Sequence, residues 1–276
     1  MKILRVGHSP DPDDAFMFYG IAKGKVRMPG FKVRHVIKDI QSLNMLALKK
    51  KLEVTAISAA VYPFAAKNYR ILACGASVGR NYGPIIVTKA PRALKSLQGK
   101  RIAVPGLQTT AYMLLKIFLG DFKPVVMDFT KIIPAVQRGK VDAGLVIHEG
   151  QMTYASFGLH KVADLGKLWH KKYKLPIPLG LDVVRKDLGP KLCKETYRVL
   201  LESIECARAN QSDSLKYAMK FGRGVDAVTA GKFVNMYVNE DTAEMGREGE
   251  SALKILFREG ARLGLCPKVT KLDIVR

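Results

Sequence analysis

Apolar positions along the chain follow two alternating patterns, one typical of buried strands and one typical of helices. Short apolar runs rich in β-branched residues predict strands at 2–7, 31–36, 54–58, 85–88, 101–104, 125–129, 143–148 and 179–184. Stretches with apolar residues three or four positions apart predict helices at 15–22, 40–50, 59–66, 110–119, 131–138, 191–209, 212–221, 227–238 and 244–263. Because strands and helices alternate, we expect an α/β fold with mostly parallel strands.

The strand and helix pattern occurs twice, which indicates two lobes. It restarts after the glycine turn at Gly99, and proline-containing segments near 84–91 and 176–184 mark the expected crossings between the lobes. We therefore expect residues 1–88 to begin lobe one and residues 89–180 to form lobe two. Residues 181–276 then return to lobe one as mostly helical structure. In such a fold the ligand cleft lies between the lobes.

Composition supports a folded chain and argues against several classes of protein. The 276 residues are 48% apolar, enough for a core, and apolar runs stay shorter than the roughly 18 residues of a membrane span. The first residues lead into a strand without the apolar segment of a secretory signal, so we expect a cytoplasmic protein. Cys74, Cys193, Cys206 and Cys266 lack metal-binding spacing, which favours reduced, buried thiols.

The net charge of +22 raises the question of a nucleic-acid partner. Most of the excess lies in the first two thirds of the chain, as single Lys or Arg residues between apolar ones. The two tight clusters, at 49–51 and 171–174, lack the interleaved aromatic residues of an RNA-binding site. We therefore expect no nucleic-acid partner, and a solvated basic surface that attracts small anionic organic molecules.

Four hydroxyl residues and one histidine follow predicted strands, where ligands bind in parallel sheets. Ser9 and Ser58 follow the first and third strands, while Thr109 and Thr110 start a helix where a carboxylate or phosphate can bind. Ordinary helix capping is the competing interpretation, and on its own the commoner one. His148 ends an apolar strand, and its imidazole exchanges a proton near neutral pH, so it is the candidate general base. A hydrogen-bonded core histidine is the alternative.

The polar turn at 9–14 contains two prolines and three carboxylates directly before a helix. This composition is typical of a rigid helix start, and the same turn can form a wall of the cleft. Its spacing matches no calcium loop. The chain also has no nucleophile elbow, no Walker loop and no dinucleotide-binding glycine motif. We therefore expect neither a metal nor an organic cofactor.

Five segments, in order along nearly the whole chain, carry a resemblance to a known family. They are SPDPDDAFMFY (9–19), EVTAIS (53–58), GKRIAVPG (99–106) with TTA (109–111), AGLVIHE (143–149) with TY (153–154), and YVN (237–239) with GREGE (246–250). They resemble the 1,4-dihydroxy-6-naphthoate synthases of the futalosine pathway of menaquinone biosynthesis. The resemblance implies the two-lobed fold of type II periplasmic binding proteins and a lyase that needs no cofactor.

By the same resemblance, the substrate is cyclic dehypoxanthine futalosine and the product is 1,4-dihydroxy-6-naphthoate, with release of a sugar-derived fragment. His148 is then the general base, and Ser58, Thr109 and Thr110 hold the ligand. An elimination that ends in an aromatic ring needs little more than a positioned base and a dry pocket, which lobe closure can supply.

The chain also departs from the family. Members often have cysteine, asparagine and threonine in place of Asp11, Asp13 and Ala15, and often arginine in place of Gln151. Added acids and a missing cation predict weaker carboxylate binding, unless Arg80 or another base compensates.

Two alternatives to the naphthoate synthase interpretation therefore stay open. The sister enzyme chorismate dehydratase shares the fold, although the Ile-His-Glu sequence at 147–149 favours the naphthoate synthase. A non-catalytic solute-binding protein for small anions uses the same cleft, but such a protein is normally exported.

Overall fold

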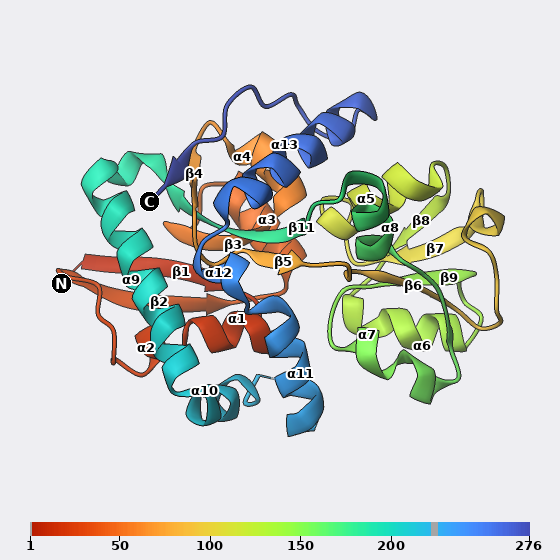
Figure 1. Ribbon diagram of the computed structural model, residues 1–276, viewed down its shortest axis with the longest axis horizontal. Helices are drawn as coiled ribbons and strands as arrows, with labels where there is room; N and C mark the ends of the chain where they lie inside the picture. The colour runs from red at the N-terminus through yellow and green to blue at the C-terminus, as the bar shows by residue number, and fades with distance from the viewer. Residues whose placement is uncertain (1, 222–225) are drawn as a thin grey trace.

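The computed structural model describes residues 2–221 and 226–276, which form two lobes, each built on one sheet (Figure 1). The strand order of the first sheet is β12-β4-β11-β3-β1-β2, with β5 also paired to β11. Its strands are β1 (Lys2–His8), β2 (Phe31–Ile37), β3 (Val54–Ser58), β4 (Tyr69–Leu72), β5 (Ser77–Gly79), β11 (Ile177–Arg185) and β12 (Ile274–Val275). The second sheet has the order β10-β6-β9-β7-β8. Its strands are β6 (Ile85–Thr88), β7 (Arg101–Val104), β8 (Lys123–Val126), β9 (Ala143–Val146) and β10 (His160–Asp164).

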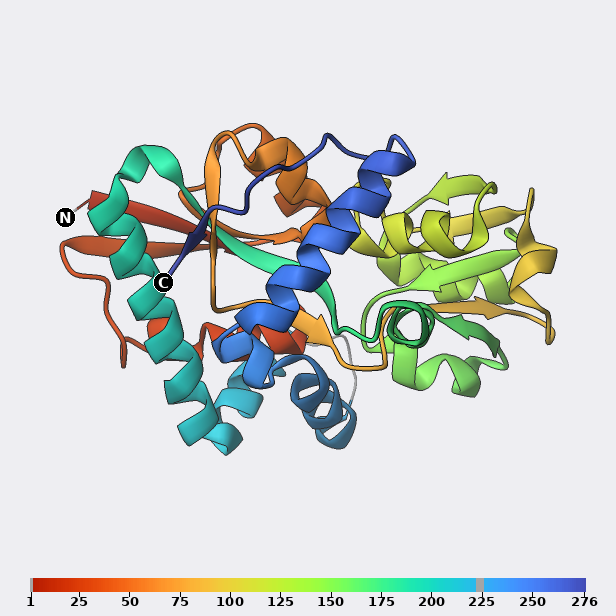
Figure 2. The same cartoon turned by 45° about the horizontal axis from the view of Figure 1, so that its top comes forward.

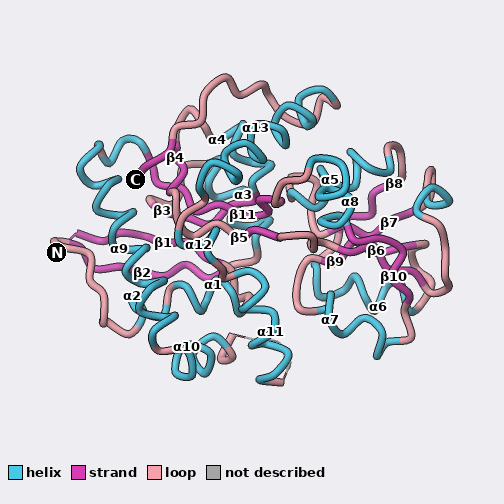
Figure 3. Tube along the Cα trace, in the orientation of Figure 1, coloured by secondary structure: helices cyan, strands magenta, loops and turns pink. Residues whose placement is uncertain are grey.

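Helices cover both sheets (Figure 3). In the first lobe they are α1 (Pro12–Met17), α2 (Tyr19–Ala22), α3 (Ile40–Leu48), α4 (Tyr62–Ala65), α9 (Pro190–Ala209), α10 (Gln211–Ala218), α11 (Ala227–Tyr237), α12 (Glu240–Ala243) and α13 (Gly246–Arg262). In the second lobe they are α5 (Thr110–Leu119), α6 (Ile132–Gln137), α7 (Gly150–Thr153) and α8 (Leu165–Tyr173). Among the described residues, no helix is long and apolar enough to cross a membrane.

The two lobes share one hydrophobic core at their junction. Helix α13 packs on β11 of the first lobe and also contacts α5 of the second, as its diagonal course in Figure 2 shows. Buried side chains from both lobes, such as Ile57, Leu114 and Leu253, belong to the same apolar cluster. Because apolar contact continues across the junction, the residues on either side of it are held close together.

Local sequence explains the elements that position the cleft. All five residues of β3 are buried, as expected for a central strand made of a short apolar run. Helix α5 begins where the Thr109 hydroxyl accepts the N–H of Tyr112, and it ends at Gly120, whose φ of +84° suits glycine. The strands predicted at 54–58, 85–88 and 101–104 and the helix at 110–119 are confirmed residue for residue.

The prediction of mostly parallel strands is wrong, since half of the ten strand pairings in the described chain are antiparallel. All five involve the strands next to the crossings: β6 pairs with β9 and β10, and β11 pairs with β3, β4 and β5. The physical reason is the path of the chain. Strand β3 ends at the cleft, whereas β11 begins there on its return from the second lobe, so the two run in opposite directions.

Several boundaries also differ from the predictions. Strand β8 ends at Val126 instead of 129, because the Asp128 side chain accepts the N–H of Thr130 and starts a helical turn. The helix predicted at 15–22 begins earlier and breaks at Phe18 into α1 and α2. Strand β9 ends at Val146, so His148 lies in the turn beyond it. Strands β4, β5, β10 and β12 and helices α7, α8 and α12 were not predicted.

Candidate functional site

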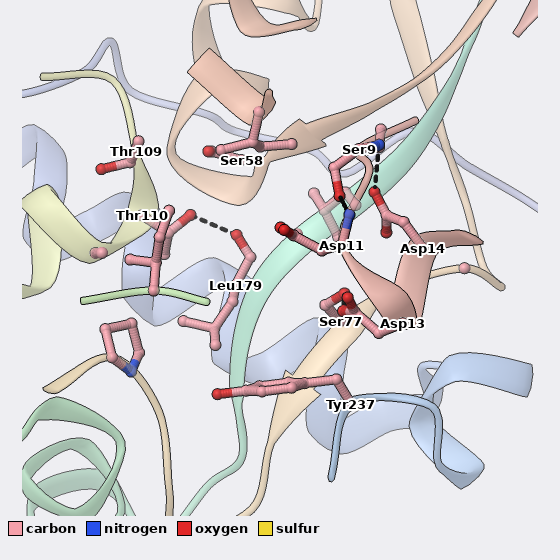
Figure 4. A pocket seen from close by; sticks show the side chains of 18 of the residues that line it. Ser9, Asp11, Asp13, Asp14, Ser58, Ser77, Thr109, Thr110, Leu179 and Tyr237 are labelled. Carbon is pink, nitrogen blue, oxygen red and sulfur yellow. Dashed lines mark hydrogen bonds between the residues drawn. The ribbon is translucent and has the colours of Figure 1, made fainter. Parts of the chain in front are cut away.

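A cavity lies between the lobes, where the first sheet faces the start of α5 (Figure 4). It encloses about 100 Å³, several times the roughly 15 Å³ that one water molecule needs, so it is larger than a packing defect. Apolar side chains including Ile40, Ile147, Leu179 and Phe233 form part of its wall. Its polar side chains are Ser9, Asp11, Asp13, Asp14, Ser58, Ser77, Thr109, Thr110 and Tyr237.

The structure brings the four predicted hydroxyl residues together around this cavity. Ser9 follows β1, Ser58 ends β3, and Thr109 and Thr110 start α5, so both lobes contribute. His148 is not among the lining residues, although its neighbour Ile147 is.

The hydroxyl of Ser58 is held from one side only, whereas that of Ser9 has two partners. The backbone N–H of Ser58 donates to Asn44 Oδ1 at 2.8 Å, and Ser58 Oγ accepts from Asn44 Nδ2 at 3.1 Å. Ser9 Oγ accepts from the backbone N–H of Asp11 at 3.1 Å, and the Ser9 side chain also hydrogen-bonds the carboxyl group of Asp14. Ser58 Oγ is thus fixed as an acceptor, and its own proton can be donated to a ligand in the cavity.

The two threonine hydroxyls are bonded to backbone on both sides. Thr109 Oγ1 donates to the carbonyl of Gly106 at 2.9 Å and accepts the N–H of Tyr112, which is helix capping. Thr110 Oγ1 donates to the carbonyl of Leu179 at 2.6 Å and accepts the N–H of Ala60 at 3.1 Å. What this segment offers a ligand is therefore mainly the backbone N–H groups of Thr110 and Ala111 at the start of α5, which have no partners within the helix.

His148 is 8% exposed and sits in the turn between β9 and α7. Its Nδ1 accepts the backbone N–H of Gly150 at 2.9 Å, and its Nε2 lies 3.3 Å from the carbonyl of Phe129. This pattern places the ring proton on Nε2. A Cβ atom at position 150 would lie 2.6 Å from His148 Cε1, so glycine is what lets the ring pack there.

Two carboxyl groups at the α1 side of the cavity, those of Asp13 and Asp14, are deeply buried. Burial raises the pKa of Asp13 well above its usual range, and the nearby Asp14 and Asp11 add to the effect. Burial also raises the pKa of Asp14 to about 6, although its Oδ2 accepts the N–H of Ser9 at 2.8 Å. Tyr237, at the end of α11, has a pKa raised by burial. Asp13 and Asp14 therefore carry less negative charge near neutral pH than the sequence suggests.

Arg80 and Gln151, the two residues that the sequence linked to a cation for the substrate carboxylate, both bind other groups of the protein. Arg80 binds both oxygens of Asp241, at 2.7 and 2.8 Å, and Glu248 at 3.1 Å, and it does not line the cavity. Gln151 on α7 accepts a hydrogen bond of 3.1 Å from the hydroxyl of Tyr237, which joins the two lobes across the cleft. Arg80 therefore does not supply the compensating charge.

Sequence reasoning missed Asn44, Ser77 and Tyr237. Asn44 is fully buried in α3, on the same face as Ile40, and this lone polar residue on an apolar face was a usable signal. Ser77 lies on β5, a strand of three residues that no pattern indicated. Within residues 2–221 and 226–276, no group of three or more His, Cys, Asp or Glu side chains is arranged to hold a metal ion.

Solved structures share this architecture. A protein from Archaeoglobus fulgidus superposes with a TM-score of 0.91 at 49% identity, covering 95% of this chain and 98% of its own. The alkanesulfonate-binding protein of Xanthomonas axonopodis pv. citri, bound to MOPS, superposes with a TM-score of 0.76 at 15% identity, covering 100% of this chain and 99% of its own. The two-lobed, periplasmic-binding-protein-like α/β fold expected from the sequence is thereby confirmed.

Sequence comparisons identify the family. Two proteins named 1,4-dihydroxy-6-naphthoate synthase are each 38% identical to this chain: one from Thermus thermophilus over 265 residues, and one from Streptomyces coelicolor over 271 residues. The alignments cover 96% of this chain in both cases, and 96% and 95% of the relatives. A family model described as menaquinone biosynthesis matches residues 4–262. The resemblance seen in the sequence motifs is thus confirmed, and the chain belongs to this menaquinone biosynthesis family of enzymes.

Proposed function

We propose that this protein is a lyase that converts cyclic dehypoxanthine futalosine to 1,4-dihydroxy-6-naphthoate without a cofactor, with His148 as the general base. The observation that carries the proposal is the interlobe cavity, which gathers Ser9, Ser58 and the start of α5 in a chain similar over 96% of its length to two named synthases.

The α5 side of the cavity suits the carboxylate of this substrate. Helix α5 has ten residues, and the backbone N–H groups of its first turn carry the positive end of the helix dipole. Ser58, positioned by Asn44, adds a hydroxyl donor beside them. A carboxylate bound there needs no lysine or arginine, because oriented backbone N–H groups bind anions by themselves.

His148 needs a change of conformation to act as the base. In the described arrangement the lone pair of Nδ1 accepts the Gly150 N–H, so it is not available for a substrate proton. Because Ile147 already lines the cavity, the proposal requires the imidazole ring to turn toward the substrate when the lobes close on it. The surrounding apolar wall then keeps water from the reacting atoms.

The test is to incubate purified protein with cyclic dehypoxanthine futalosine and follow 1,4-dihydroxy-6-naphthoate by chromatography and mass. His148→Ala should lose at least about 100-fold in rate, as expected for removal of a general base. His160→Ala, at an exposed position on β10, is the matched control and should keep the parent rate. If the parent makes no product, chorismate is the next substrate to offer. If neither substrate reacts while a carboxylated ligand still binds, the protein is a binding protein and the proposal fails.

A further inference from the structure

The polar groups of the cavity form two opposite poles (Figure 4). The start of α5 and Ser58 form one, and the carboxyl groups of Asp11, Asp13 and Asp14 form the other. Among the described lining residues there is no lysine, arginine or histidine, although the whole chain has a net charge of +22. The cavity therefore distinguishes the two ends of a ligand by hydrogen-bond donors and acceptors instead of by ion pairs.

Asp13 is the member of the acidic pole with unused hydrogen-bonding capacity. Asp13 is only 7% exposed, yet it lines the cavity. Its Oδ2 accepts a hydrogen bond of 3.3 Å from Ser77 Oγ, whereas its Oδ1 is buried with no hydrogen-bond partner in the described structure. Buried polar atoms in proteins are nearly always satisfied, so an unsatisfied one on a cavity wall indicates a partner that binds there.

The groups facing Asp13 are acidic or neutral. Asp11 and Asp14 come from its own segment, Tyr237 approaches from α11, and Asp182 lies on β11 beside Asp14. Burial raises the pKa of Asp13 well above its usual range, and no cation contributes to its surroundings. Burial and the neighbouring acids thus favour the protonated form of Asp13, whose O–H can be donated to a ligand, as an amide donates its N–H.

We propose that Asp13 binds the substrate as a neutral carboxylic acid, donating a hydrogen bond to a hydroxyl of the sugar-derived part while the carboxylate end lies against α5. The proposal rests on the proposed function and adds the orientation of the substrate and the residue that recognises its hydroxylated end. The reverse orientation places two acidic ends together, which repel each other or compete for a single proton.

The experiment compares kcat/KM across pH for the parent, Asp13→Asn and Asp13→Ala. The parent should lose activity as the pH rises through the pKa of Asp13, because the ionised carboxylate has no proton to donate. Asp13→Asn keeps a donor and does not titrate, so it should stay within about 10-fold of the parent at neutral pH and lack the alkaline fall. The kcat/KM of Asp13→Ala should fall about 10- to 100-fold, mainly through a higher KM, as expected for one hydrogen bond to a buried group. Asp121→Asn, with a side chain 95% exposed, is the matched control.

Two results overturn the proposal: Asp13→Ala as active as the parent, or Asp13→Asn with the same alkaline fall as the parent. A measurement without substrate separates this failure from that of the proposed function. In infrared spectra at neutral pH, the band of protonated carboxyl groups should weaken in Asp13→Asn and stay unchanged in Asp121→Asn. An unchanged band in Asp13→Asn refutes the neutral acid even if the parent is active. If the band weakens in Asp13→Asn but the parent is inactive, Asp13 is a neutral acid and the substrate assigned to the cavity is wrong.

Discussion

The hydroxyl of Thr110 should stabilise the junction between the lobes by an amount that can be measured. It is 2% exposed and joins three elements, since it belongs to α5, donates to Leu179 on β11 and accepts from Ala60 in the turn after β3. Leu179 lies at the register shift in the pairing of β11 with β5, between Pro178 and Gly180. Removing the hydroxyl leaves two backbone groups without this partner.

Thr110→Val removes the hydroxyl and keeps the shape of the side chain. With about 1–2 kcal/mol lost for each unpaired backbone group, the free energy of unfolding should fall by about 2–4 kcal/mol. Thr110→Ser keeps the hydroxyl and loses one methyl group, so its free energy of unfolding should be only about 1 kcal/mol below that of the parent. Urea unfolding followed by circular dichroism, at the same pH for all three proteins, gives both values.

The comparison of the two variants decides the role of this side chain. If valine and serine destabilise the protein equally, the hydroxyl does not join the lobes in solution and is available to a ligand, as the sequence suggested. A larger loss for valine, with the serine variant still active, means that Thr110 holds the cleft together and that α5 binds through its backbone.

Three further measurements test the site. The folded protein binds the proton of Asp14 more tightly than the unfolded chain does, because burial raises the pKa of Asp14 from an ordinary 3.8 to about 6. The resulting contribution to stability is fully present below pH 3.8 and is lost as the pH rises through 6. The gap in unfolding free energy between Asp14→Asn and the parent should therefore shift by about 3 kcal/mol in favour of the variant between pH 3.5 and 7, and a constant gap contradicts this. Tyr237→Phe removes the hydrogen bond across the cleft, so substrate should bind about 5-fold more weakly, as read from KM with kcat nearly unchanged; an unchanged KM shows that this bond does not favour closure. Gly75→Ala places a Cβ at a φ of +84° and only 2.1 Å from Asp182 Oδ2, so the free energy of unfolding, measured by calorimetry, should fall by about 2–4 kcal/mol. In Gly139→Ala, where φ is +69° and the surrounding space is open, the free energy of unfolding should fall by no more than about 1 kcal/mol. An equal fall in both variants would mean that the contact with Asp182 is unimportant.

Elements with a strong local signal were predictable from the sequence. Strands β3 and β7 are short apolar runs that stay buried wherever they pair, and α5 has a threonine cap at one end and glycine at the other. Short strands such as β5 and β12 were not predictable, because three or two residues carry no periodic pattern and become strands only through pairing with β11 and β4. Strand direction next to the crossings likewise depended on the path between the lobes.

For the site, the sequence alone determined which hydroxyl residues follow the strands, because the ends of neighbouring strands meet at one edge of a sheet. The tertiary structure decided what each of them has left to offer a ligand. Ser58 keeps a proton to donate because Asn44 reaches it from another element, whereas the hydroxyl of Thr110 is bonded on both sides by Leu179 and Ala60. Burial by residues distant in sequence also raises the pKa of the Asp13 carboxyl group and so favours its neutral form, since the energy of a charge depends on its surroundings and not only on its neighbours along the chain.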